Sequence, residues 1–192
     1  MKILYSILFS LCCSSLLYAQ PDRSLTASLG INQSFPKKNV RLNGSQLQFN
    51  FTKKMSNQLA IDIGVGVRQQ DLEETIFTTQ DAIKARYISF PLRAKYHINP
   101  KLYIAGGFMY DLLTKAQYED KQSKESLNLK KYFNDYNFAG LLSAAYIVDR
   151  TVEIRLDYSL GISNKFTDDE NALYDQKNSF VAFSIGYLLF RD

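Results

Sequence analysis

The sequence has no tryptophan, one histidine and two cysteines among its 192 residues. Both cysteines, Cys12 and Cys13, lie in the N-terminal segment, so the rest of the chain can form neither a disulfide nor a thiolate zinc site. The one histidine, His97, lies beside Asn99 and Pro100 in a short expected turn, and no expected long loop holds a histidine that could act as a general base. We therefore expect no catalytic residue, no metal site and no cofactor.

Two acidic runs, DLEE at 71–74 and DDE at 168–170, are the exceptions to this lack of ligands. Their carboxylates could bind Ca²⁺ or bridge to lipopolysaccharide through divalent ions. A solvated loop is the simpler interpretation of both runs.

Beyond its N-terminal segment, the chain has no apolar run that approaches the length of a membrane-spanning helix. The first 20 residues, MKILYSILFSLCCSSLLYAQ, combine Lys2, an apolar run and the small residue Ala19, which is typical of a secretory signal peptide. We expect residues 1–19 to be the signal peptide and residues 20–192 to be one exported domain. A retained anchor fits less well because the run is shorter than the ~20 residues that a spanning helix needs. Lipidation also fits less well, because Leu11 precedes Cys12 where a small residue is required.

The chain also has no large excess of charge of either sign. Removing Lys2 from the 23 Lys and Arg residues leaves a near balance with the 19 Asp and Glu residues, and the charges are scattered. Nucleic acid is therefore not an expected partner.

Alternation of apolar and polar residues with a period of two is the dominant pattern, and helical periodicity is nearly absent. The clearest case is LAIDIGVGVRQ at 59–69, where every second residue from Leu59 to Val67 is apolar. The pattern predicts eight strands, at 24–33, 46–53, 59–69, 85–98, 102–115, 136–148, 152–164 and 179–190.

The connections between these strands alternate between long and short. The linkers near 34–45, 70–84, 116–135 and 165–178 are long and polar, whereas those near 54–58, 97–101 and 149–151 are tight. An even strand number with alternating loop lengths is typical of an up-and-down transmembrane barrel in the outer membrane, with short periplasmic turns and long extracellular loops. We therefore predict an all-β, eight-stranded antiparallel barrel located in the cell outer membrane.

The alternation also predicts which side chains face lipid and which face the lumen. In such a barrel the apolar face points to the acyl chains, and eight strands leave an interior that side chains can fill. Charges in so narrow a lumen should pair with one another. The predicted lumen residues, four of each sign, are Asp62, Arg68, Arg93, Lys95, Asp111, Glu153, Arg155 and Asp157. The alternative is a soluble exported barrel of the lipocalin kind, with its apolar face inside around a small apolar ligand.

The segment YISFPLRAKY at 87–96 contains a proline within a strand pattern. Because Pro91 lacks a backbone donor, we expect it to mark a β-bulge in the barrel wall.

This segment, with LYIAGGFMYDLL at 102–113 and Gln20 directly after the signal peptide, resembles the PorT-like outer-membrane β-barrel family of Bacteroidetes-type bacteria. The resemblance implies a small integral barrel and carries over no catalytic residue. Some relatives are linked to protein secretion machinery. The expected partners are therefore outer-membrane lipids, lipopolysaccharide and envelope or secretion-machinery proteins, contacted chiefly through the loop at 116–135.

Overall fold

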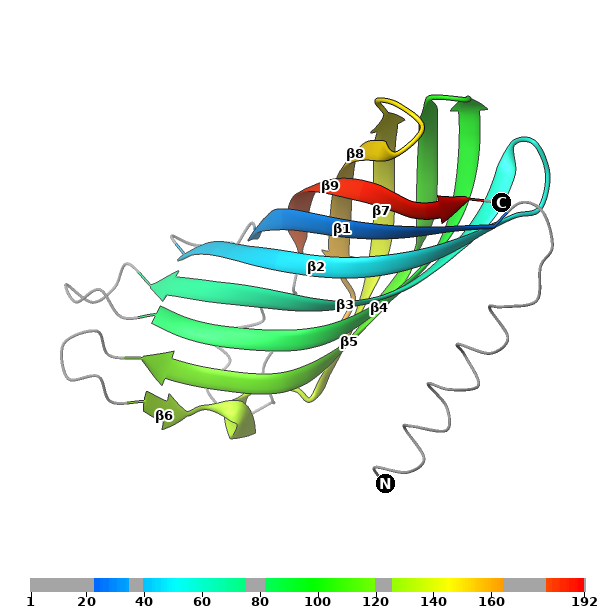
Figure 1. The fold of residues 1–192 in the computed structure, drawn as a ribbon. Coiled ribbons are helices and arrows are strands. Elements are labelled where there is room, and N and C mark those ends of the chain that lie inside the picture. The colour runs from blue at the N-terminus through cyan, green and yellow to red at the C-terminus, as the bar shows by residue number, and fades with distance from the viewer. Residues whose placement is uncertain (1–22, 35–39, 75–81, 120–125, 164–178, 192) are drawn as a thin grey trace, which may run out of the picture.

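The computed structural model describes residues 23–34, 40–74, 82–119, 126–163 and 179–191 (Figure 1). The predicted signal peptide at 1–19, with Cys12 and Cys13, lies outside these residues, as do Gln20 and the acidic run at 168–170. The long strands within the described part are β1 (Arg23–Ser34), β2 (Val40–Lys54), β3 (Leu59–Glu74), β4 (Ala82–Asn99), β5 (Leu102–Glu119), β7 (Tyr136–Ile147), β8 (Val152–Gly161) and β9 (Phe180–Arg191). A short strand, β6 (Ser126–Asn128), and a 3-10 turn, η1 (Lys130–Tyr132), lie between β5 and β7.

These eight long strands form a closed barrel. Each strand pairs antiparallel with its neighbour in the chain, β5 pairs with β7 past the short β6, and β1 pairs with β9 to close the sheet. Closure pairs the two terminal strands of the sheet with each other. A barrel in hydrocarbon requires this pairing, because unpaired backbone groups at a strand edge would have no hydrogen-bond partner there. The predicted eight-stranded antiparallel up-and-down barrel is confirmed.

The tight connections all lie at one end of the barrel. The β2–β3, β4–β5 and β7–β8 connections share this end with the start of β1 and the end of β9 (Figure 1). We call it the turn end, formed by residues 55–58, 100–101 and 148–151 with the adjoining strand ends. The opposite end, where the longer connections join the strands, is called the loop end.

Several strands extend further toward the loop end than the apolar pattern predicted. β2 and β3 remain paired as far as Val40 and Glu74, and β4 and β5 as far as Ala82 and Glu119. The predicted linkers at 34–45, 70–84 and 116–135 were therefore too long, and the acidic run at 71–74 belongs to β3 rather than to a loop. Each extension is held by backbone pairing with a neighbouring strand, as between Leu42 and Leu72 and between Leu72 and Ile83, and pairing between strands cannot be read from the alternation within one segment.

The two faces of the wall differ in polarity. On β7, for example, Leu142 is 63% exposed on the outside, whereas its neighbour Ser143 is 7% exposed and faces the interior. The outer face of the whole barrel carries Leu, Ile, Val and Phe with Tyr near the strand ends, including Tyr96, Tyr146 and Tyr187. An apolar outside and a polar inside are the reverse of a lipocalin-like barrel, so the soluble alternative is not favoured.

Pro91 does not produce the predicted β-bulge. Its pairing with Met109 of β5 falls in an uninterrupted register, and the irregularities of this ladder lie at Arg86/Tyr87 and His97/Asn99 instead. On the β3 side the register is also constant, and the pairing skips only the two positions opposite Phe90 and Pro91. The ring fits because β3 has a glycine there: a Cβ at Gly64 would lie 2.8 Å from Pro91 Cγ.

Among the described residues, no helix has the length and apolar character needed to cross a membrane.

Candidate functional site

The barrel interior holds a group of ion pairs around Asp62 of β3. Asp62 lies directly opposite Arg93 of β4, and Arg93 Nε donates a hydrogen bond of 2.9 Å to Asp62 Oδ2. Lys95, two residues further along β4, places Nζ 3.0 Å from Asp62 Oδ1 and donates to Thr52 Oγ1 at 3.1 Å. Asp62 is fully buried and the two cations are nearly so. One carboxylate thus lies between two buried cations.

A second group of charges lies on three alternate residues of β8. Arg155 Nε donates to Asp157 Oδ2 at 3.0 Å, and Arg155 Nη1 lies 3.2 Å from Glu153 Oε1. Two other strands add neutral donors: Ser143 of β7 donates to Asp157 at 2.5 Å, and the Tyr103 hydroxyl of β5 donates to Glu153 at 3.1 Å. Both carboxylates therefore have a charged and a neutral partner.

The two groups are joined across the lumen. Arg93 Nη1 lies 3.1 Å from Asp157 Oδ1, which links β4 to β8. Gln48 Oε1 of β2 accepts hydrogen bonds from Arg155 Nη2 at 2.8 Å and from Arg93 Nη2 at 3.5 Å. Six of the eight predicted lumen residues thus belong to one connected set, which we call the central network: Asp62, Arg93, Lys95, Glu153, Arg155 and Asp157.

The other two predicted residues form a separate pair nearer the loop end. Arg68 Nη2 lies 2.6 Å from Asp111 Oδ2, and the guanidinium lies between the rings of Tyr87 and Phe180, at 4.9 and 4.5 Å from their centroids. Ser89 donates to Asp111 at 2.6 Å. Among the ion pairs of the described residues, none connects this pair to the central network.

Neutral side chains that were not predicted from the sequence complete these networks. Gln48, Asn50, Thr52, Ser143 and Asn137 all donate to or accept from the buried charges. They share the inward parity of the charged residues on their strands, so the same alternation could have marked them.

Small residues leave the space that the central network occupies. A Cβ at Gly107 would meet the carbonyl oxygen of Leu92 and lie 2.8 Å from the Cα of Arg93. A Cβ at Gly186 would lie 2.8 Å from Cγ of Glu153. Any larger residue at these positions would displace the wall or the charged side chains.

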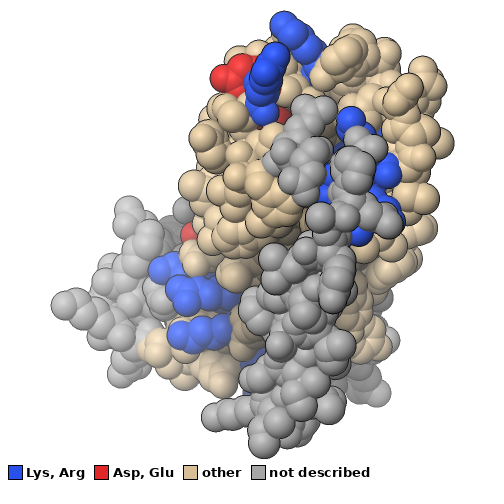
Figure 2. Space-filling model, turned by 45° about the vertical axis from the view of Figure 1, so that its right-hand side comes forward, with Lys and Arg blue, Asp and Glu red and all other residues tan. Residues whose placement is uncertain are grey.

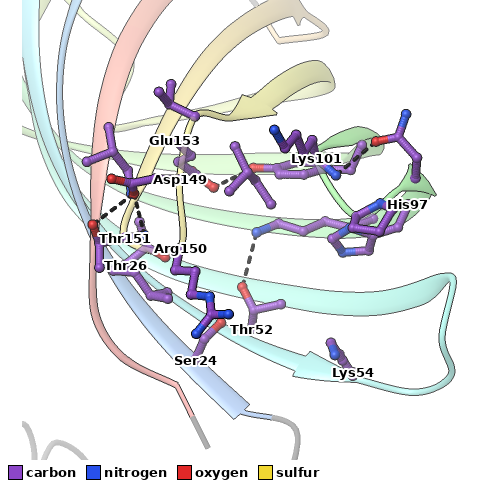
Figure 3. A pocket seen from close by; sticks show the side chains of 18 of the residues that line it. Ser24, Thr26, Thr52, Lys54, His97, Lys101, Asp149, Arg150, Thr151 and Glu153 are labelled. Atoms are coloured by element: carbon purple, nitrogen blue, oxygen red, sulfur yellow. Dashed lines mark hydrogen bonds between the residues drawn. The ribbon is translucent and has the colours of Figure 1, made fainter.

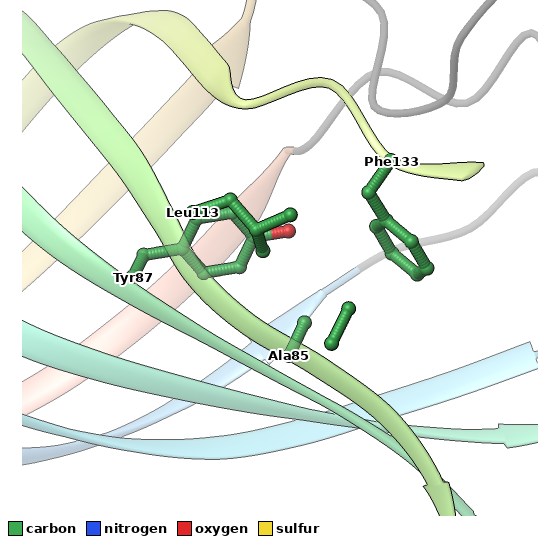
Figure 4. Packing of buried hydrophobic residues seen from close by; sticks show 5 residues of the cluster. Ala85, Tyr87, Leu113 and Phe133 are labelled. Atoms are coloured by element: carbon green, nitrogen blue, oxygen red, sulfur yellow. The ribbon is translucent and has the colours of Figure 1, made fainter. Parts of the chain in front are cut away.

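An apolar cluster lies inside the barrel beyond the Arg68–Asp111 pair, toward the loop end. Phe133, 3% exposed, packs with Ala85, Leu113 and Ala116, and with the Tyr87 ring that also contacts Arg68 (Figure 4). This finding corrects the prediction that 116–135 is one long polar linker: it contributes the end of β5, β6 and η1, and Phe133 is buried in the mouth of the barrel.

A cavity of about 840 Å³ lies at the turn end (Figure 3). Its walls come from the start of β1, the end of β2 and the β4–β5 and β7–β8 turns, and its lining includes Lys95, Tyr103 and Glu153. The cavity therefore extends inward to the edge of the central network.

The turn end also contains the one histidine and a carboxylate with a shifted pKa. The His97 ring lies 5.4 Å from the Tyr103 ring and tilted against it. Asp149 Oδ1 accepts hydrogen bonds from the backbone N–H and hydroxyl of Thr151 and from the N–H of Val152, which lowers the pKa of its carboxyl. Within the described residues, no group of three or more His, Cys, Asp or Glu side chains could hold a metal ion.

Comparison with solved structures places the fold among small outer-membrane barrels. The attachment invasion locus protein Ail of Yersinia pestis is 12% identical and superposes with a TM-score of 0.50 over 89% of this chain and 100% of Ail. The structure of Ail in complex with the heparin analogue sucrose octasulfate superposes with a TM-score of 0.53, again over 89% of this chain and 100% of Ail. Neisserial surface protein A is 10% identical, with a TM-score of 0.54 over 86% of this chain and 96% of that protein.

No curated protein sequence matches the chain. The family model of the outer membrane protein β-barrel domain matches residues 19–167, which is most of the barrel. The closed eight-stranded barrel, its apolar outer face and this match agree, and the chain belongs to the outer membrane protein β-barrel domain family.

Proposed function

We propose that this protein is a non-enzymatic barrel of the outer membrane whose interior is sealed by paired charges and whose loop end contacts partners at the cell surface. The observation that carries the proposal is the central network, in which a guanidinium of β4 and one of β8 share the carboxylate of Asp157. A lining of balanced, mutually paired charges suits a plug, whereas a selective pore is lined by rings of one sign.

Planar-bilayer recording tests the sealed interior. We expect the purified protein to show no stepwise conductance in salt solution, because ions would have to break buried ion pairs to pass. The double variant Arg93→Leu/Phe133→Ala is recorded for comparison. It removes one side chain of the central network and the Phe133 ring from the apolar cluster near the loop end. Regular single-channel steps in the unaltered protein would refute the proposal of a closed lumen.

The proposed orientation places the loop end outside the cell and the turn end in the periplasm. Because both cysteines lie in the predicted signal peptide, single cysteines can be introduced into the rest of the chain without background labelling. Leu127→Cys at the exposed loop end should react with a membrane-impermeant maleimide in intact cells, whereas Asn57→Cys at the turn end should react only after permeabilisation. The reverse labelling pattern would mean that the turn end faces the cell exterior and the loop end faces the periplasm.

The partner at the loop end is proposed to be an envelope component: lipopolysaccharide, a surface glycan or a protein of the secretion machinery. The resemblance of YISFPLRAKY and LYIAGGFMYDLL to PorT-like barrels supports the last of these. The binding of a heparin analogue by Ail supports contact with a glycan. A photo-crosslinking residue at Leu127, on the exposed β6, should yield a specific adduct in cells, while the same residue at outward-facing Leu142 should react only with lipid. Equal adducts at both positions would argue against a partner at the loop end.

A further inference from the structure

The turn-end cavity is not used by the proposed function, and its chemistry suggests a ligand. Its volume of about 840 Å³ falls within the ~300–1,000 Å³ of typical small-molecule sites. The residues labelled in Figure 3 surround it from four parts of the fold: Ser24 and Thr26 on β1, Thr52 and Lys54 on β2, His97 and Lys101 beside the β4–β5 turn, and Asp149 to Glu153 at the β7–β8 turn.

The charge of the lining is mainly positive. Five Lys and Arg residues line the cavity, but only two carboxylates, Asp149 and Glu153. In Figure 2, in which the right-hand side of Figure 1 comes forward, Lys and Arg side chains are visible in the upper part of the molecule with an acidic group beside them, and further Lys and Arg side chains lie lower down. A concave site lined by one sign of charge concentrates ligands of the opposite sign.

The two carboxylates of the lining are already occupied by the protein itself. Asp149 accepts three hydrogen bonds from its own turn, and Glu153 is held by Arg155 and Tyr103. The ion pairs of the described residues include neither Lys101 nor Arg150. Lys101 and Arg150 are therefore not neutralised by the acidic residues of the lining.

The inner wall of the cavity is rigid. Lys95, 4% exposed, is fixed by Asp62 and Thr52, and its ammonium lies 4.8 Å from the centroid of the Tyr103 ring. Lys95 is itself a member of the central network, so this inner wall is held in place without a ligand. A preformed site costs little ordering on binding.

We propose that the turn-end cavity binds a small anion with phosphate or carboxylate groups, held by Lys101 and Arg150 above the wall formed by Lys95 and Tyr103. A guanidinium forks onto such oxyanions and the lysine ammonium adds a point charge. The anion is either a soluble molecule or the headgroup of an anionic lipid, because the exposed Tyr96, Tyr146 and Tyr187 near this end suit the membrane interface. The proposal does not depend on which end of the barrel faces the cell exterior.

The single histidine provides a residue-specific probe, since His97 lines the cavity and no other imidazole contributes to the NMR spectrum. The protein, folded in a zwitterionic detergent, is titrated at low ionic strength with inorganic phosphate and, separately, with citrate. We expect saturable shifts of the His97 ring signals with either anion. A control titration with sodium chloride at matched ionic strength should produce no saturable shift. Absence of saturation by both anions, or an equal response to chloride, would overturn the proposal.

The variant Lys101→Gln/Arg150→Gln removes two cavity cations without altering the central network. It should weaken binding by about tenfold or more, an effect of the size expected for lost charge-assisted contacts. The control variant Lys130→Gln/Lys131→Gln makes the same change of net charge near the loop end and should bind as the unaltered protein does. Equal weakening in both variants would mean a general charge effect and would also overturn the site. Heat-dependent gel mobility verifies that each variant is folded.

Nanodiscs distinguish the two sources of the anion. If a lipid headgroup is the ligand, the His97 signals should already be shifted in phosphatidylglycerol relative to phosphatidylcholine, and added phosphate should not move them further. If the ligand is soluble, both lipids should give the same starting spectrum and the same titration.

Discussion

Arg93 Nε donates a hydrogen bond of 2.9 Å to Oδ2 of Asp62, the residue directly opposite it in the β3–β4 ladder. The same guanidinium reaches Asp157 of β8 through Nη1 at 3.1 Å. One side chain therefore connects two carboxylates from strands that are not neighbours. Its removal should leave both carboxylates buried with fewer cations around them.

Arg93→Leu should lower the free energy of unfolding by about 2–4 kcal/mol, because breaking a buried ion pair leaves uncompensated charge. Urea unfolding of the barrel in detergent or lipid measures the change. Arg86→Leu is the control, since Arg86 lies on the same strand but is exposed, and its loss should have little effect. An unchanged midpoint for Arg93→Leu would mean that Arg93 does not lie in a closed lumen.

Arg68 and Asp111 should be energetically coupled. Each single change, Arg68→Met or Asp111→Leu, leaves one buried charge without its partner, whereas the double variant removes both. The cost of the double variant should be smaller than the sum of the single costs by about 0.5–3 kcal/mol. The free energies of unfolding of the unaltered protein, the two single variants and the double variant give this coupling as a double-mutant cycle. Strict additivity would show that the 2.6 Å contact contributes no interaction energy.

Gly107→Ala should destabilise the barrel by about 1–3 kcal/mol, as overpacking of a filled interior does. The added methyl group would meet the backbone of Leu92 and Arg93, which cannot rotate away as a side chain could. Gly140→Ala is the matched control, because a Cβ at Gly140 would have no atom within 4 Å. Thermal unfolding followed by gel mobility compares the two. Similar losses for both variants would contradict the packing argument.

Leu142→Arg should destabilise the protein in lipid vesicles by about 2–4 kcal/mol, since a charge on the outer face near the bilayer midplane must be buried in hydrocarbon. Leu127→Arg on β6 makes the same substitution at a similarly exposed leucine, 60% against 63%, but at the loop end. This substitution should leave the stability of the protein nearly unchanged. Equal effects in vesicles would argue against a membrane band around Leu142.

Asp149 should titrate below its ordinary pKa of 3.8. Its carboxylate form accepts three hydrogen bonds, so the turn stabilises the charged state. Because the folded pKa is the lower one, this contribution is complete above pH 3.8 and is lost as the pH falls through the folded value. Carbon-detected NMR of the side-chain carboxyl gives the pKa. Thr151→Val should raise it toward 3.8 by removing one donor, and a value at or above 3.8 in the unaltered protein would refute the assignment.

Alternation along the chain was sufficient to predict the barrel and the side of its wall that each residue occupies. Side chains alternate between the two faces of a strand, so the inward parity of Asp62, Arg93 and Asp157 follows once an apolar face is assigned to lipid. Alternation was not sufficient for the strand ends near Val40, Glu74 and Glu119, where pairing with the neighbouring strand continues the ladder. The β-bulge expected at Pro91 from its missing backbone donor was wrong, because the space opposite that ring is provided by Gly64 of another strand.

The sequence by itself therefore determined the architecture and the strand number, because these depend on periodicity within single segments. Only the tertiary structure decided which charges meet. The contact of Arg93 with Asp157, the isolation of the Arg68–Asp111 pair and the burial of Phe133 in the barrel mouth join residues far apart in the chain. Barrel closure and strand register set those contacts, and the cavity at the turn end arises for the same reason, since its walls come from four separate parts of the fold.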